Sequence, residues 1–305
     1  MANTFTHSPQ QLATVAAKLA GADFNLAKLI STNAAADFAE GTGATVRIPV
    51  PGAIPTHSKL IGDKSTALIA DELAEKYIDV TLTDHLYSLT VLSEGDLSLE
   101  LEDYARQVLA PQTRAIAAKI EALTAATMSA TPETTSVAYS ATAPAKAITA
   151  ARRILRTNGV PESAKLFAAV GASVYADLLD APASAGFDAN GKTVRGVEVI
   201  ESTRLADSAI AVFIPEAFAL VARAPKVPQG AAYGASITTP VFDDKRGVSF
   251  AVRVINDYDS NVAADRSLVS SFVKVAAMPL PVDRENGTVD LVEHGGVVRI
   301  DTAAA

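Results

Sequence analysis

The sequence contains no cysteine among its 305 residues. This absence excludes a disulfide framework, a thiolate metal site and a cysteine nucleophile, and it is compatible with folding in a reducing cytosol. No stretch approaches the roughly 18 consecutive apolar residues of a membrane-spanning helix, and no cationic segment followed by an apolar run opens the chain. We therefore expect neither a secreted disulfide scaffold nor a membrane protein.

Basic clusters and catalytic patterns are also missing. The 26 Lys and Arg residues face 34 Asp and Glu residues, and the net charge of -8 repels a phosphate backbone unless basic groups cluster. The four histidines, His7, His57, His85 and His294, lack the spacing of metal ligands, and no G-x-S-x-G elbow occurs. We expect surface histidines, no metal, no cofactor and no catalytic residue, and hence not an enzyme.

One motif points the other way. Residues 186–193 run Gly-Phe-Asp-Ala-Asn-Gly-Lys-Thr and match the phosphate-binding pattern G-x-x-x-x-G-K-T. That function needs a buried strand before the loop and a helix after it. Here Ala, Pro and Ser precede the motif, and β-prone valines follow Thr193. We predict a glycine-rich turn that leads into a strand, and a P-loop nucleotide hydrolase remains the alternative from another functional class.

Asp257, Asp259 and Asn261 copy the first half of a calcium-binding loop. Val262 replaces the glycine of the sharp turn, and Leu268 stands where a bidentate Glu belongs. We predict an ordinary solvated loop between two strands.

The composition is that of a folded protein, because 49% of the residues are hydrophobic and 20% are charged. Residues 8–11, Ser-Pro-Gln-Gln, are typical of a helix start, so a short amphipathic arm is predicted up to Gly21. Residues 45–50 and 78–82 alternate as strands do, and together they predict a long two-stranded excursion with a polar tip. A lone hairpin is marginal in water, so the excursion needs support from its own chain or another copy.

A long helix is predicted from Asp96 to Thr124. Pro111 removes the hydrogen bond to the carbonyl of Gln107 and is expected to bend the helix. We expect Leu101, Tyr104, Val108 and Pro111 to be structurally important. The predicted apolar stripe consists of Leu97, Leu101, Tyr104, Val108, Ala115, Ile120 and Leu123.

Truncating Leu101 or Val108 to Ala should cost about 1 to 5 kcal/mol if the site is buried. Glu102→Ala on the opposite side should cost well under ~1 kcal/mol. Further predicted elements are helices at Pro144–Arg156, Ser173–Leu179 and Pro215–Arg223, and strands at Leu166–Val170, Ala209–Ile214, Val248–Ile255 and Leu268–Val275.

Several segments, in this order and spacing, resemble the major capsid proteins of tailed bacteriophages, in particular the group similar to the coat protein of podovirus P-twenty-two. None of them is a catalytic signature, so the resemblance depends on their order. They are Asp37–Gly41 before Thr45–Pro49, Asp84–Ser88 before Leu99–Tyr104, Gly196–Ser202, Phe218–Pro225 and Asn256–Asp259.

The resemblance implies an α+β chain with the HK97-type phage capsid fold. The implied parts are an N-terminal arm at 1–44, an extended loop (E-loop) at 45–92, a peripheral domain at 93–185 with the spine helix 96–124, an axial domain at 186–270, and a C-terminal return to the peripheral domain at 271–305.

The implied function is that of a major capsid (coat) protein, which self-assembles as hexamers and pentamers into the icosahedral head shell around the phage genome. Expected partners are a portal protein, a possible decoration protein and packaged double-stranded DNA without sequence-specific binding, with no membrane. The chain is too short for the scaffolding region of some members, so a separate scaffolding protein is expected. Its place is the virion, after assembly in the bacterial host cytoplasm. An encapsulin-like compartment shell with the same fold is the alternative.

Overall fold

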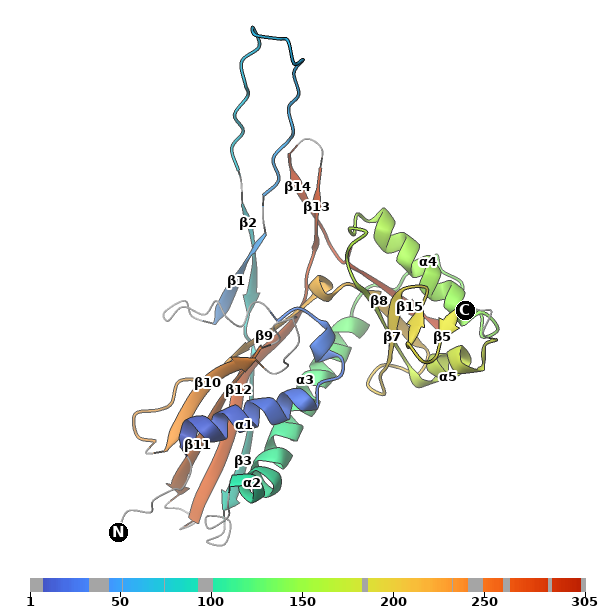
Figure 1. The fold of residues 1–305 in the computed structure, drawn as a ribbon. Coiled ribbons are helices and arrows are strands. Elements are labelled where there is room, and N and C mark those ends of the chain that lie inside the picture. Colours follow the sequence, from blue (N-terminus) through green and yellow to red (C-terminus); the bar gives the residue numbers. More distant parts are fainter. Residues whose placement is uncertain are drawn as a thin grey trace.

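The computed structural model describes residues 8–32, 44–50, 52–73, 75–92, 101–182, 186–231, 233–240, 249–259, 264–284 and 287–302, without the side chains of Leu101 and Glu102. Two sheets, each with its own helices, form the body of the molecule, and two hairpins project from it (Figure 1). Within the described ranges, no helix is both long and apolar enough to cross a membrane.

The first sheet is antiparallel and has five strands. Its order is β10-β11-β12-β3, and β9 pairs with the other end of the long strand β12. The helices α1 and α3 pack against this sheet (Figure 1). The bounds are β3 (Asp84–Leu92), β9 (Phe218–Arg223), β10 (Gly234–Pro240), β11 (Ser249–Asp259), β12 (Ala264–Ala277), α1 (Pro9–Ala22) and α3 (Ala110–Ser129).

The predicted arm helix is confirmed as α1. Ser8 and Gln11 form a capping box, in which the Ser8 hydroxyl accepts from the Gln11 backbone and the Gln11 side chain accepts from the Ser8 backbone. The buried face consists mainly of small residues, which let the helix axis approach the sheet closely. These buried residues are Leu12, Ala13, Ala16, Ala17, Ala20 and Gly21.

The long helix differs from its prediction in the middle. It runs through α2 (Leu101–Tyr104), the π-helical turn η4 (Ala105–Leu109) and α3, and ends at Ser129 rather than Thr124; its predicted start lies outside the described residues. The Ala110 N–H donates to the Ala105 carbonyl, five residues back, directly before Pro111. A widened turn therefore precedes the proline, which has no N–H to donate.

The π turn shifts the phase of the buried face. One extra residue per turn rotates the following side chains by about 100° relative to a regular helix. Ala115, predicted in the apolar stripe, is therefore exposed, whereas Gln112 and Thr113 are buried. A stripe drawn with a constant period cannot anticipate this shift.

The second sheet has six strands in the order β15-β8-β4-β7-β6-β5. Only β4 and β7 run parallel, and every residue of β4 and β8 is buried. Helix α4 packs against β8 and β15, and α5 packs against α4. The bounds are β4 (Leu166–Val170), β5 (Phe187–Asp188), β6 (Thr193–Val194), β7 (Val197–Glu201), β8 (Ala209–Phe213), β15 (Val297–Asp301), α4 (Pro144–Thr157) and α5 (Ala172–Asp180).

The larger projecting hairpin starts from β1 (Thr45–Val50) and β2 (Lys76–Thr81), which pair antiparallel as predicted. Beyond them, residues 52–73 extend far from the body (Figure 1). The base is held by a small apolar cluster, in which Val46 and Val80 contact Ala219, Val221 and Met278. The second projecting hairpin consists of β13 (Leu280–Asp283) and β14 (Val289–Val292).

The two sheets divide the chain differently from the expected ranges. Strand β3, expected in the extended loop, pairs along its whole length with β12. Strands β10 and β11 and the first part of β12, expected in the range 186–270 of the axial domain, share this first sheet, whereas β4, expected in the range 93–185, lies in the second. The domain ranges themselves stay a prediction, because strand partners are set by burial across the whole fold and need not follow chain order.

The segment predicted as a helix at Pro215–Arg223 is also different. Only the 3-10 turn η6 (Pro215–Ala217) is helical, and the remainder is β9, of which five residues are buried. A short run that is apolar on all sides suits a buried helix and a buried strand equally well.

Candidate assembly surfaces

The extended loop, residues 52–73, presents large apolar side chains to solvent. Its tip was predicted to be polar, and this holds only in part, because Leu60 and Ile61 stand exposed beside the polar residues Asp63, Ser65 and Thr66. Exposure ranges from 54% for Ile54 to complete exposure for Ile61. Apolar side chains gathered on a projecting segment mark an interaction site. The exposed set is Ile54, Leu60, Ile61, Leu68, Ile69 and Leu73.

Polar side chains of the same loop bind one another across its two sides. His57 Nε2 lies 2.7 Å from Asp71 Oδ2, and Lys59 Nζ donates to the Thr66 carbonyl at 3.1 Å. At the tip, hydrogen bonds from Thr66 and Ser65 hold the pKa of Asp63 well below its usual range. These polar groups thus bond to one another within the loop, and its large apolar side chains remain exposed to solvent.

A second apolar surface lies on β3. Tyr87, Leu89 and Val91 alternate along one face of the strand and are each at least half exposed. Leu92, on the other face, is buried, and that side of the sheet packs against α3. In the neighbouring strand β12, Leu268 stands opposite Leu89 and is partly buried. We call Tyr87, Leu89 and Val91 the β3 stripe.

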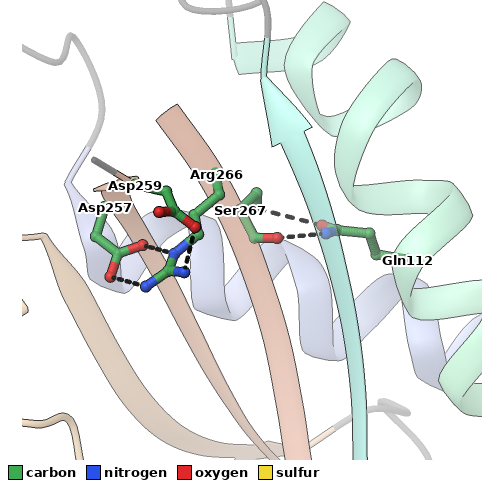
Figure 2. A network of polar contacts seen from close by, with 5 residues as sticks. All are labelled: Gln112, Asp257, Asp259, Arg266 and Ser267. Atoms are coloured by element: carbon green, nitrogen blue, oxygen red, sulfur yellow. Dashed lines mark hydrogen bonds and ion pairs between the residues drawn. The ribbon is translucent and has the colours of Figure 1, made fainter. Parts of the chain in front are cut away.

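A polar network is centred on Arg266, which stands opposite Val91 of the β3 stripe (Figure 2). Arg266 on β12 binds Asp257 Oδ1 at 2.6 Å and Asp259 Oδ2 at 2.9 Å, both on β11. Because Arg266 and Ser267 are successive residues of a strand, they point to opposite faces (Figure 2). Ser267 Oγ donates to Gln112 Oε1 at 3.2 Å, and Gln112 Nε2 donates to the Ser267 carbonyl at 2.8 Å.

This network shows what the two aspartates of the calcium-binding pattern bind. Asp257 and Asp259 both bind the guanidinium of Arg266, whose single positive charge offsets part of their two negative charges. The prediction of a solvated loop at these residues is wrong for Asp257 and Asp259, which lie in β11. Residues 260–263 lie outside the described residues. In the described part of the chain, no group of three or more His, Asp or Glu side chains is placed to hold a metal ion.

The histidines are not all surface residues. His57 and His85 are exposed, and His7 lies outside the described residues. His294 is partly buried, and its Nδ1 is buried without a hydrogen-bond partner. Its backbone has φ of 54°, which places it in a tight turn before β15.

The phosphate-binding pattern at residues 186–193 forms the turn of a hairpin. Strand β5 pairs antiparallel with β6, which begins at Thr193, and β6 continues through a second turn into β7. Lys192 has a left-handed backbone with φ of 49°. The prediction of a glycine-rich turn before a strand is confirmed, and the helix that a P-loop requires at this point is replaced by strands.

The four residues singled out on the long helix occupy different environments. Tyr104 and Val108 are both 6% exposed, whereas Pro111 is exposed; the Leu101 side chain lies outside the described residues. The Tyr104 hydroxyl accepts a hydrogen bond from Asn256 Nδ2 at 3.0 Å, which connects the helix to β11.

Glu121 on α3 was not expected to matter, yet it fastens the arm to the long helix. The carboxylate is 4% exposed and accepts three backbone hydrogen bonds, from Asn25 at 2.8 Å, Leu26 at 2.9 Å and Ala27 at 2.9 Å. These amides begin the 3-10 turn η1 (Ala27–Leu29), whose first N–H groups have no partner within the turn. A negative charge suits this position.

We predict that Val108→Ala lowers the free energy of unfolding by about 1 to 3 kcal/mol, because it removes two buried methyl groups and leaves a small cavity. Gln107→Ala, at the neighbouring exposed position, is the control and should change stability by less than about 0.5 kcal/mol. Urea unfolding of unassembled subunits measures both. Equal losses would mean that the buried face is wrongly placed. The earlier control Glu102 lies outside the described side chains.

Solved structures of phage proteins are similar to this chain in fold. A chain from Mycobacterium phage Che8 is similar over 92% of this chain and 91% of that chain, with 18% identity and a TM-score of 0.56. The capsid of Ralstonia phage GP4 is similar over 90% and 87%, with 10% identity and a TM-score of 0.53. The capsid structure of the cyanophage P-SCSP1u is similar over 89% and 85%, with 12% identity and a TM-score of 0.51.

These likenesses define the class of the fold: it is the HK97-type capsid fold, and the fold predicted from the sequence is confirmed. The family follows from the sequence itself. Residues 91–270 match the family described as phage capsid protein, so the chain belongs to that family. No curated protein sequence matches the chain.

Proposed function

We propose that this phage capsid protein is the major subunit of the head shell and builds it through repeated contacts between copies, made by the apolar side chains of the extended loop. The observation that carries the proposal is the row of exposed Ile and Leu residues on residues 54–73. Fully burying one such side chain stabilises by about 1.5 to 3 kcal/mol. Several loops engaged together therefore give a stable shell from individually weak contacts.

The parts of the HK97-type fold are proposed to follow the sheets. The peripheral domain comprises the first sheet with α1 and α3, and the axial domain comprises the second sheet with α4 and α5. The extended loop then spans β1, residues 52–73 and β2. What supports this division is that each sheet carries its own helices. In capsomers, the second sheet would surround the symmetry axes of hexamers and pentamers.

The proposed partners beyond the chain itself are a portal protein, a separate scaffolding protein and packaged double-stranded DNA. With a net charge of -8, the chain is expected to face DNA without a high-affinity site. A decoration protein is a further candidate partner. The role is structural and needs no catalytic residue.

We predict that the purified chain forms large particles as its concentration rises, because many weak contacts depend on mass action. Size-exclusion chromatography followed by negative-stain microscopy is the measurement. A matched pair of variants identifies the surface: Ile61→Ser should reduce particle yield, and Ser58→Ala should not. A stable monomer or dimer under every salt, scaffold and concentration condition would count against the proposal.

A further inference from the structure

The β13–β14 hairpin lies beside the extended loop and contacts both of its sides (Figure 1). On the outgoing side, Gly287 at the hairpin tip packs against Pro55: a Cβ at Gly287 would stand 2.2 Å from Pro55 Cδ. On the returning side, Lys76 Nζ donates a hydrogen bond to the Val289 carbonyl. Pro55 and Lys76 lie near opposite ends of the loop sequence, so the hairpin holds both the outgoing and the returning segment.

Gly287 suits this position for two reasons. Its φ of +77° is strained for residues with a side chain, and no Cβ fits between its backbone and the Pro55 ring. The backbone of Gly287 thus packs directly against the ring of Pro55. By comparison, Gly62 near the loop tip has nothing within 4 Å of its missing Cβ.

The hairpin and the residues just after it also contact the end of α4. A Cβ at Gly159 would lie 2.9 Å from Val282 Cγ1, and Asn158 Nδ2 donates to the Gly295 carbonyl at 3.2 Å. These contacts connect the hairpin to the helix that covers the second sheet. The loop base, in contrast, is held by the apolar cluster on β9 and after the end of β12, which belongs to the first sheet.

The hairpin itself is braced. Its two strands pair from Leu280 with Val292 to Asp283 with Val289, and Arg284 Nε binds Asp290 Oδ2 at 2.8 Å near the tip. Leu280 and Val289 are each 5% exposed. A short paired hairpin that also contacts α4 transmits a displacement better than a single strand does.

We propose that the β13–β14 hairpin is a strut that fixes the direction of the extended loop relative to α4. The loop and the second sheet then turn together, so the angle at which the loop meets a neighbouring copy is set by the body of the subunit. The consequence for shell building rests on the proposed function, whereas the strut itself is a property of the single subunit.

The test measures the loop direction in unassembled subunits. Because the chain has no cysteine, spin labels attach only to cysteines introduced at Leu60 in the loop and Glu162 after α4. The parent should give a narrow distribution of distances between the labels. Replacing both loop contacts, Pro55→Ala with Lys76→Met, should widen that distribution about twofold or more, because the loop is then held only at its base.

Gly62→Ala is the control and should leave the distribution unchanged. Gly287→Val keeps the loop sequence intact and forces the hairpin tip away from Pro55, so it should shift the mean distance. Circular dichroism identifies any variant that fails to fold. A parent-like distribution in both folded strut variants overturns the proposal, and a change in either supports it.

The same variants separate the strut from the proposed function. If the parent never forms shells, the shell proposal fails while the distance measurement still decides the strut. If the parent forms shells of one diameter, the strut variants should form particles with a wider spread of diameters. Uniform particles together with an unchanged distance distribution would contradict the proposal that the hairpin is a strut.

Discussion

Deleting residues 55–70 and closing the gap with a short glycine linker should leave a folded subunit that no longer builds shells. The deletion removes four of the exposed apolar residues, Leu60, Ile61, Leu68 and Ile69, and none of the cluster that holds the loop base. Losing the burial of two such side chains alone costs about 3 to 6 kcal/mol per subunit. A loss of this size raises the concentration needed for assembly more than a hundredfold, because about 1.4 kcal/mol corresponds to a factor of ten.

Circular dichroism and particle counts by electron microscopy measure the two halves of this prediction. The double variant Leu60→Ser with Ile61→Ser keeps the backbone and tests the side chains alone. Shells that form normally from the deleted chain would mean that the loop has been assigned the wrong role. A subunit that loses its fold would show instead that the loop supports the core.

Glu121→Ala should lower the free energy of unfolding by about 3 to 5 kcal/mol, because it leaves three backbone N–H groups without an acceptor, at about 1 to 3 kcal/mol each when buried. The affected amides are those of Asn25, Leu26 and Ala27. A cavity of about 270 Å³ borders Glu121 on the side of Arg114 and Ser202. Water entering from there keeps the loss below the sum of three full penalties.

Urea unfolding of unassembled subunits is again the measurement. Glu121→Gln keeps the size but has only one accepting oxygen, so it should lose part of the stability. Glu162→Ala, at an exposed position, is the matched control and should change stability by less than about 0.5 kcal/mol. If Glu121→Ala matches this control, the arm is held by its apolar face alone.

The features predicted correctly from the sequence are those set by neighbouring residues. The capping box of Ser8 and Gln11 lies within one turn, and the glycine-rich turn before Thr193 is set by the residues around it. The features that were missed depend on distant partners. In the sequence, Glu121 is only a charged residue on a helix, and its role requires the arm to lie over it. Strand β3, which falls within the range expected for the extended loop, is defined by its pairing with β12.

The extended loop was misjudged for a related reason. Its prolines, glycines and charges suggested a polar tip, and the Ile and Leu residues between them were visible in the sequence. Whether such residues are covered depends on what lies beside them in space. The charged groups turn inward to one another, as His57 does to Asp71, and the apolar groups remain outside.

The pairing of β3 with β12 also bears on synthesis of the chain. More than 170 residues separate Leu92 from its partner Asp265. At about 5 to 20 residues per second, a ribosome needs about 9 to 35 s to deliver the partner strand. The first sheet is therefore completed late. Until then, the backbone N–H and C=O groups of β3 that later pair with β12 lack this partner, while many identical chains are being synthesised nearby. A protein made in the large numbers that a shell requires has to keep this edge of β3 from premature pairing.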